Sequence, residues 1–124
     1  MLSLSVAPRA DEIGGARRTV RSCAAEFGAA NPDGLAVAVS EAITNAVVHA
    51  YVGLAPTDID VRVELTADAV VVVVADRGRG MQPRADSPGI GLGLPLIASL
   101  SQRFDVAPRP GGGTSLTLWF ARAA

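Results

Sequence analysis

The sequence predicts an α/β (α+β) chain folded as a two-layer sandwich, in which a mixed, largely antiparallel sheet carries its helices on one face. One observation is that helical periodicity dominates residues 11–51, after a short strand-like start. Another is that the strand-like segments after residue 57 are joined in pairs by short turns. Strands joined in this way pair as antiparallel hairpins, whereas parallel neighbours need a long crossover. Helices that do not alternate with parallel strands collect on one face of the sheet.

Length and composition fit one folded domain spanning residues 1–124. Hydrophobic residues make up 49% of the chain, which excludes a disordered protein, and a chain of this size can bury a sizeable core. Only 4% of the residues are aromatic, so the core must be aliphatic. The formal net charge of −1 gives no indication of nucleic-acid binding.

Nothing in the sequence predicts export or membrane association. The N-terminal residues are too few and too polar for a secretion signal, and no segment approaches about 18 apolar residues without charges or helix breakers. We therefore expect a cytoplasmic protein. Cys23 stands alone, which excludes a disulfide framework or a zinc site, and its apolar surroundings predict a buried structural thiol.

The first half of the chain is expected to form an edge strand and two helices. The strand covers residues 2–6, and the first helix runs over 11–27 and is ended by Gly28. The second helix begins at an Asn31 cap. A proline and an aspartate follow the cap, and both favour the first turn of a helix. Apolar positions recur at helical spacing until about residue 51.

The second half of the chain is expected to form two hairpins around a short helix. Apolar and polar residues alternate strictly over 58–65, which predicts a strand with one wet face. The segment 69–75 is continuously apolar, which predicts a central strand covered on both sides. A short helix over 92–101 and strands over 104–107 and 114–120 complete the chain.

A carboxylate, an amide and an imidazole recur on the second helix. Glu41, Asn45 and His49 are each four residues apart, so a regular helix places them in one stripe. Most of the remaining helix is apolar. Burying the three polar groups without hydrogen-bond partners would cost on the order of several kcal/mol in total. The stripe is therefore either a functional site or a plain solvated face.

An aspartate and two glycines follow the continuously apolar strand. Asp76 stands at the end of the strand, so its carboxylate lies at the rim of the core, and Gly78 and Gly80 permit tight turns and close approach of a ligand. A lone Gly-x-Gly is a weak signal, and the alternative is a simple turn leaving the strand.

Two further glycine motifs come later in the chain. The segment 89–93 reads Gly-x-Gly-x-Gly and precedes a helix, whose free N–H groups and positive dipole end suit phosphates. It is neither a Rossmann fingerprint, because no strand precedes it, nor a P-loop, because the chain has no lysine. The pair 113–114, Gly-Thr, opens the last strand and alone would indicate only a hairpin.

In this order and spacing the four motifs resemble those of the GHKL ATPases, and most closely those of the anti-sigma-factor serine kinases. Residues 39–51 are similar to the N box of that family almost throughout. Residues 76–80 resemble its G1 box, 89–93 its G2 box, and 113–114 its closing motif. The resemblance implies the histidine-kinase-like (Bergerat) ATP-binding fold, with ATP and Mg²⁺ as cofactors.

The resemblance also implies roles for individual residues. Asn45 would ligate Mg²⁺ through its amide oxygen, and Asp76 would accept a hydrogen bond from the adenine amino group, supported by Thr114. Glu41 would be the catalytic general base toward the attacking hydroxyl. His49 would line the site or be a structural histidine. The residues that would wrap the nucleotide and its phosphates are Gly78, Gly80, Arg84, Gly89, Gly91, Leu92 and Gly93.

One departure from the family concerns the segment over the phosphates. Residues 81–88 are few, and Ser87 and Pro88 stand where family members often carry a basic residue. Arg84 is the one cation in this segment, with Arg79 nearby. Because phosphoryl transfer depends on stabilising negative charge, ATP binding is predicted more strongly than kinase activity.

The leading hypothesis is therefore a protein serine/threonine kinase of the anti-sigma-factor type. By the resemblance it would phosphorylate an anti-sigma factor antagonist of the STAS type, sequester a sigma factor and work as a homodimer. The cluster of Arg17, Arg18 and Arg21 is either its partner-docking surface or an ordinary solvated helix face.

Two rivals remain. One is a catalytically weak ATP- and Mg²⁺-dependent binding module of the same fold. The other is the ATP-binding half of a histidine kinase, which ranks lower because we find no dimerisation helices in the chain and because His49, its one histidine, lies within the nucleotide helix.

Overall fold

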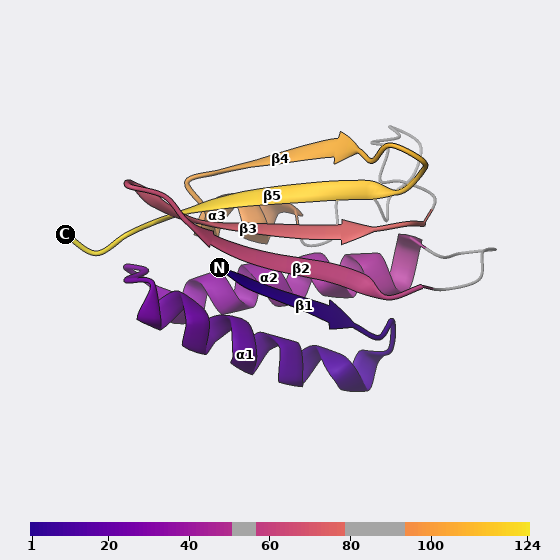
Figure 1. Ribbon diagram of the computed structural model, residues 1–124, viewed down its shortest axis with the longest axis horizontal. Helices are drawn as coiled ribbons and strands as arrows, with labels where there is room; N and C mark the ends of the chain where they lie inside the picture. Colours follow the sequence, from indigo (N-terminus) through magenta and orange to yellow (C-terminus); the bar gives the residue numbers. More distant parts are fainter. Residues whose placement is uncertain (51–56, 79–93) are drawn as a thin grey trace.

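The computed structural model describes residues 1–50, 57–78 and 94–124, without the side chains of residues 49 and 50. A sheet and a layer of helices make up this part of the chain (Figure 1). The elements are β1 (Leu2–Val6), a 3₁₀ turn (Ala10–Glu12), α1 (Ile13–Glu26), α2 (Pro32–Asn45), a π-helical turn (Ala46–Ala50), β2 (Ile59–Leu65), β3 (Ala69–Asp76), α3 (Leu94–Leu100), β4 (Arg103–Pro108) and β5 (Thr114–Ala121). The predicted two-layer α+β architecture is confirmed.

The strands lie side by side in the order β1-β2-β3-β5-β4, and all the pairings are antiparallel (Figure 1). The segment predicted as an edge strand, β1, lies at one edge. The prediction of a mixed sheet needs a correction, because the described sheet contains no parallel pair. Strand β4 does run parallel to β3, but β5 lies between them and pairs with both.

The helices pack on one face of the sheet in the order of the chain. Helix α1 contacts β1 and β2, α2 contacts β3, and α3 contacts β4. Alternate strand residues face this layer, so the core is aliphatic, as predicted, and the largest fully buried side chains are Leu35, Ile43, Ile59, Ile97 and Leu118. Cys23 packs against this core but is only partly buried. No helix in the described ranges is long and apolar enough to cross a membrane.

The end of α1 shows why Gly28 stops the helix. Gly28 adopts a left-handed φ of 82°, which costs a glycine little. The amide of Gly28 donates to Ala25 at 3.1 Å, and the amide of Ala29 donates to Ala24 at 2.9 Å. These two bonds form the Schellman arrangement, which satisfies the last carbonyls of the helix and turns the chain toward α2.

The open face of the sheet is covered by its own side chains. Val71 and Ala75 of β3 point to this face yet are buried. Trp119 lies opposite Val71 in the strand register, and the guanidinium of Arg103 stacks 4.0 Å from the centre of the Trp119 ring. The predicted covering of β3 on both sides is therefore achieved by helices on one face and by long neighbouring side chains on the other.

Candidate functional site

Three polar side chains are buried in the described part of the chain: Asn45, Asp76 and Thr114, with 5%, 5% and 3% exposure. The sequence predicts all three as site residues. Burying a polar group costs free energy unless it is paired. Their positions therefore call for an explanation that the aliphatic core does not supply.

Helix α2 brings Glu41 and Asn45 to the same side. Both lie within its regular part, one turn apart, so their side chains share a stripe. Asn45 is buried and Glu41 is half-buried, so neither stands free in solvent. The alternative of a plain solvated face is wrong for Asn45. Helix α2 is buried at most positions from Gly34 to Asn45, and nearly all of its buried residues are small or aliphatic. It can therefore pack closely against the sheet.

The amide of Asn45 is not satisfied by the described protein atoms. Its Nδ2 is buried and has no hydrogen-bond partner within the described ranges, and no other buried side-chain atom there shares this property. An unmade buried hydrogen bond costs about 1–3 kcal/mol. The amide also offers an oxygen, the ligand type that Mg²⁺ prefers. A hard cation could therefore bind the amide oxygen of Asn45, while the anion that accompanies the cation accepts a hydrogen bond from Nδ2.

The helix changes pitch directly after Asn45. Residues Ala46–Ala50 form a π-helical turn, whereas the sequence predicts a regular helix to about residue 51. Because a π-turn has wider i→i+5 bonding, the four-residue stripe holds for Glu41 and Asn45 but cannot be extended to His49. The side chain of His49 lies outside the described part. A single π-turn inside a helix is frequent at functional sites.

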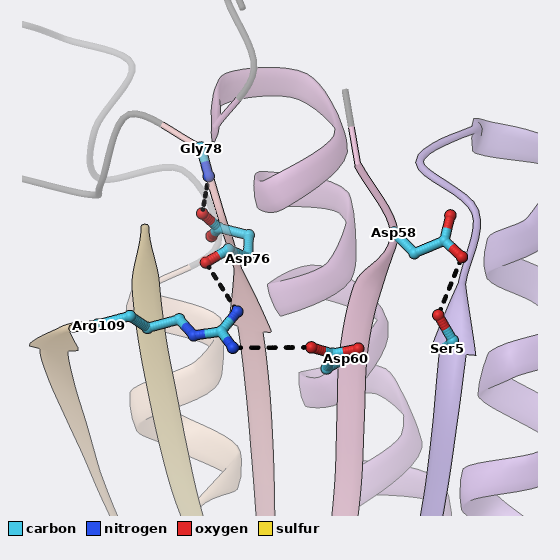
Figure 2. Close-up of polar contacts among 6 residues, drawn as sticks. All are labelled: Ser5, Asp58, Asp60, Asp76, Gly78 and Arg109. Carbon is cyan, nitrogen blue, oxygen red and sulfur yellow. Dashed lines mark hydrogen bonds and ion pairs between the residues drawn. The ribbon is translucent and has the colours of Figure 1, made fainter. Parts of the chain in front are cut away.

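Asp76 ends β3 with its carboxylate on the helix face. It shares that face with Val70, Val72 and Val74, since strand residues alternate. The amide of Gly78 donates to its Oδ1 at 2.9 Å (Figure 2). Burial raises the pKa of the Asp76 carboxyl, while hydrogen bonds from the Gly78 and Thr114 backbones and the charge of Arg109 oppose the rise. The result is a buried acceptor held by two amides.

Thr114 lies directly opposite Asp76 in the β3–β5 register. The preceding Gly113 has a φ of 98°, and a Cβ added there would lie 2.0 Å from the Asp76 carbonyl oxygen. The hairpin can therefore reach β3 this closely only with a glycine at that position. The predicted Gly113-Thr114 motif thus packs against the aspartate motif.

The sequence did not predict the role of Arg109. Its guanidinium donates from Nη1 to the Asp76 carbonyl at 3.2 Å, and its Nη2 lies 3.7 Å from a carboxylate oxygen of Asp60 (Figure 2). The Arg109 side chain is 24% exposed, less than the other ion-paired arginines of the described part. A possible signal was an arginine next to the Pro-Gly-Gly-Gly turn, but its contacts are 33 and more residues away.

The remaining predicted residues lie outside the described ranges. They are Gly80, Arg84, Gly89, Gly91, Leu92 and Gly93, together with the rest of segment 79–93. Their roles stay predictions.

The two halves of the candidate site lie at one end of the molecule. Figure 1 shows the C-terminal turn of α2 at the same end of the sheet as the C-terminal end of β3. A half-buried acid and an amide without a partner among the described residues thus lie on the helix layer, and a buried acceptor lies at the end of the sheet. Glu41 and Asn45 can bind the end of a ligand that carries an anion with its cation. Asp76 can accept a hydrogen bond from a donor at the other end of the same ligand.

Comparisons with known proteins identify the family and the fold. Residues 6–120 match the histidine kinase-like ATPase domain family. Among solved structures, the chain is similar to the histidine kinase domain of a blue-light activated histidine kinase from Erythrobacter litoralis, with a TM-score of 0.62 and 21% identity. The alignment covers 89% of this chain and 61% of that one, so this chain spans less than two thirds of that domain. No curated protein sequence gives a significant match.

The structural likeness supports the fold, and the family match covers nearly the whole chain. The motifs that predict the site fall within the matched range. The chain therefore belongs to the histidine kinase-like ATPase domains, the GHKL type of ATPase.

Proposed function

We propose that this domain binds ATP with Mg²⁺ between the C-terminal half of α2 and the end of β3. The observation that supports this most directly is Asn45, whose buried amide nitrogen has no partner among the described residues. A polar group kept in this state at a cost of about 1–3 kcal/mol is expected to serve a ligand. Asp76, a buried acceptor at the same end of the sheet, suits the adenine amino group.

In this proposal each residue of the site has one task. Asn45 holds Mg²⁺ through its amide oxygen, and the bound metal neutralises charge on the phosphates. Asp76, supported by Thr114, accepts the hydrogen bond from the adenine amino group. By the resemblance, the glycine motifs and Arg84 bind the nucleotide and its phosphates.

We further propose that the chain is a cytoplasmic protein serine/threonine kinase of the anti-sigma-factor type. Glu41 takes the proton of an attacking hydroxyl, the oxygen bonds to the γ-phosphorus, and the bond to ADP breaks. The substrate is a hydroxyl on a STAS-type anti-sigma factor antagonist, and a homodimer of the domain sequesters a sigma factor. The likeness of residues 39–51 to the N box of those kinases supports this assignment.

Calorimetric titration with ATP and Mg²⁺ tests the binding site. Asn45→Ala should weaken binding at least about tenfold, because a charge-assisted contact is lost. Its free energy of unfolding should stay level or rise, since the substitution removes a buried group that has no partner among the described residues.

Thr44→Ala is the matched control for this titration. Thr44 is the neighbouring polar residue, and its hydroxyl already donates to the Ser40 carbonyl at 2.7 Å. It should bind ATP as the wild type does. Equal affinity in Asn45→Ala and wild type would show that the amide does not serve the nucleotide.

A second candidate is an ATP- and Mg²⁺-dependent binding module with little catalysis. The presence of Ser87 and Pro88, where related kinases often carry a basic residue, favours it. Transfer of labelled γ-phosphate to a co-encoded antagonist separates the two candidates. The kinase proposal expects transfer by wild type and none by Glu41→Ala, with ATP binding retained in both. Absence of transfer by the wild type to every such antagonist favours the module.

A further inference from the structure

The open face of the sheet holds a hollow of about 620 Å³ that the proposed nucleotide site does not use. Its floor is made of small side chains near the ends of the strands, including Ala75 and Ser115. These two residues are register partners on neighbouring strands. They leave room for Arg109, which comes from the β4–β5 connection and lines the same hollow.

Arg109 crosses the ends of the strands on this face. Figure 2 shows its side chain reaching from the hairpin past β5 to Asp76 on β3 and Asp60 on β2. One guanidinium therefore joins the hairpin to two strands. Its planar fork suits this use, since several N–H groups point to separate partners at once.

The contact with Asp76 is made to the backbone and not to the carboxylate. Arg109 holds the carbonyl oxygen of Asp76 at 3.2 Å, while the carboxylate accepts from Gly78. Gly113 packs against the same carbonyl so closely that a side chain at position 113 would push the hairpin away from β3. The backbone of the last strand residue is thereby fixed from the face opposite its side chain. A fixed backbone sets the direction of the Cα–Cβ bond, and the bond from the Gly78 amide then orients the carboxylate.

We propose that Arg109 is a positioning residue for base recognition, which acts through the Asp76 backbone from the far face of the sheet. This inference rests on the proposed function in one respect, namely that Asp76 reads the adenine amino group. It assigns specificity to a residue that would not touch the nucleotide. Asp60 supports the same arrangement, because its carboxylate lies near the other end of the guanidinium.

The test compares the affinities for ATP and inosine triphosphate, which carries an oxygen in place of the amino group. The wild type should prefer ATP. Arg109→Met should reduce the ATP-to-inosine preference about tenfold, the effect of one lost charged hydrogen bond. A purely structural role would lower both affinities together and leave their ratio unchanged.

Arg62→Met is the matched control. Arg62 lines the same hollow, but its guanidinium pairs with Glu64 at 3.0 Å and makes no hydrogen bond to Asp76 within the described part of the chain. It should keep the wild-type ratio. Asp60→Asn is a second, milder variant that loosens Arg109 and should lower the preference about threefold, a fraction of the effect of losing the bond.

A second measurement needs no nucleotide. The Gly78 amide, which donates to Asp76 at 2.9 Å, reports the place of the carboxylate in a nuclear magnetic resonance spectrum. Its resonance should move in Arg109→Met and Asp60→Asn but not in Arg62→Met. Unchanged ratios and an unchanged Gly78 resonance in the folded variants would overturn the inference. If the wild type binds no ATP, the proposed function fails, and the Gly78 resonance alone still decides whether Arg109 positions Asp76.

Discussion

At the scale of single residues, conformational constraint and burial coincide around Asp76. Its carboxylate is buried on one face, its carbonyl is held by Arg109 on the other, and Gly113 touches its backbone. A glycine at 113 is required for two separate reasons. The φ of 98° disfavours other residues, and any Cβ would overlap the Asp76 carbonyl and the Arg77 Cα.

We expect Gly113→Ala to lower the free energy of unfolding by about 2–4 kcal/mol, because backbone strain and overlap add. Gly111→Ala is the comparison, since Gly111 has a φ of 84° but nothing within 4 Å of an added Cβ. It should cost only about 1 kcal/mol, the strain alone. Urea unfolding of both variants measures the difference. Equal losses would show that the close approach to Asp76 is not a constraint.

At the scale of elements, α2 is defined sharply at its start and altered at its end. The Asn31 side chain accepts from the Gly34 amide at 3.0 Å, and a Cβ on Gly34 would lie 2.4 Å from the Asn31 amide nitrogen. The Asn31 side chain can therefore cap the helix in this position only because residue 34 is a glycine. At the other end the regular helix stops at Asn45 and a π-turn follows, so the site residues sit where the helix changes geometry.

Asn31→Ala should destabilise the protein by about 1 kcal/mol, because one helix-terminal amide loses its acceptor. Asn31→Ser keeps an acceptor oxygen at that position and should lose much less. Thermal unfolding of the two variants measures this. A serine variant as unstable as the alanine variant would indicate that packing, and not the cap bond, is what Asn31 contributes.

At the scale of the whole molecule, the charge on Asp76 couples folding to pH. Burial raises its pKa above the value in the unfolded chain, so between the two values the folded protein binds the proton more tightly. The contribution of Asp76 to stability therefore falls as pH rises through that window. Above the window, the buried charged carboxylate lowers the free energy of unfolding. In the proposed function the carboxylate is kept because it binds the nucleotide.

Asp76→Asn should therefore raise the melting temperature at pH 7, and the gain should shrink as pH falls through the window. ATP affinity should fall in the same variant, since an amide is a weaker acceptor than a carboxylate. Melting curves from pH 3 to 8 measure the first effect, with Asp105→Asn on the exposed edge strand as control. A variant that is less stable at pH 7 by an amount independent of pH would contradict this account.

Local patterns determined most of the secondary structure and the identity of the buried polar residues. The Asn31 cap, the Gly28 stop and the alternation in β2 are each fixed by neighbours within a few residues, so the sequence alone predicts them. Asn45, Asp76 and Thr114 were predicted because their motifs are also local. The family follows from the order of those motifs along the chain.

Only the tertiary structure decided how these pieces meet. The order β1-β2-β3-β5-β4 places β5 between β3 and β4 and so prevents a parallel β3–β4 pair in the described sheet. Three features have no local signature: the Asn45 amide without a partner in the described ranges, the π-turn after it, and the contact of Arg109 with Asp76. Each depends on which atoms from distant parts of the chain come within bonding distance, and a one-dimensional pattern does not contain that information.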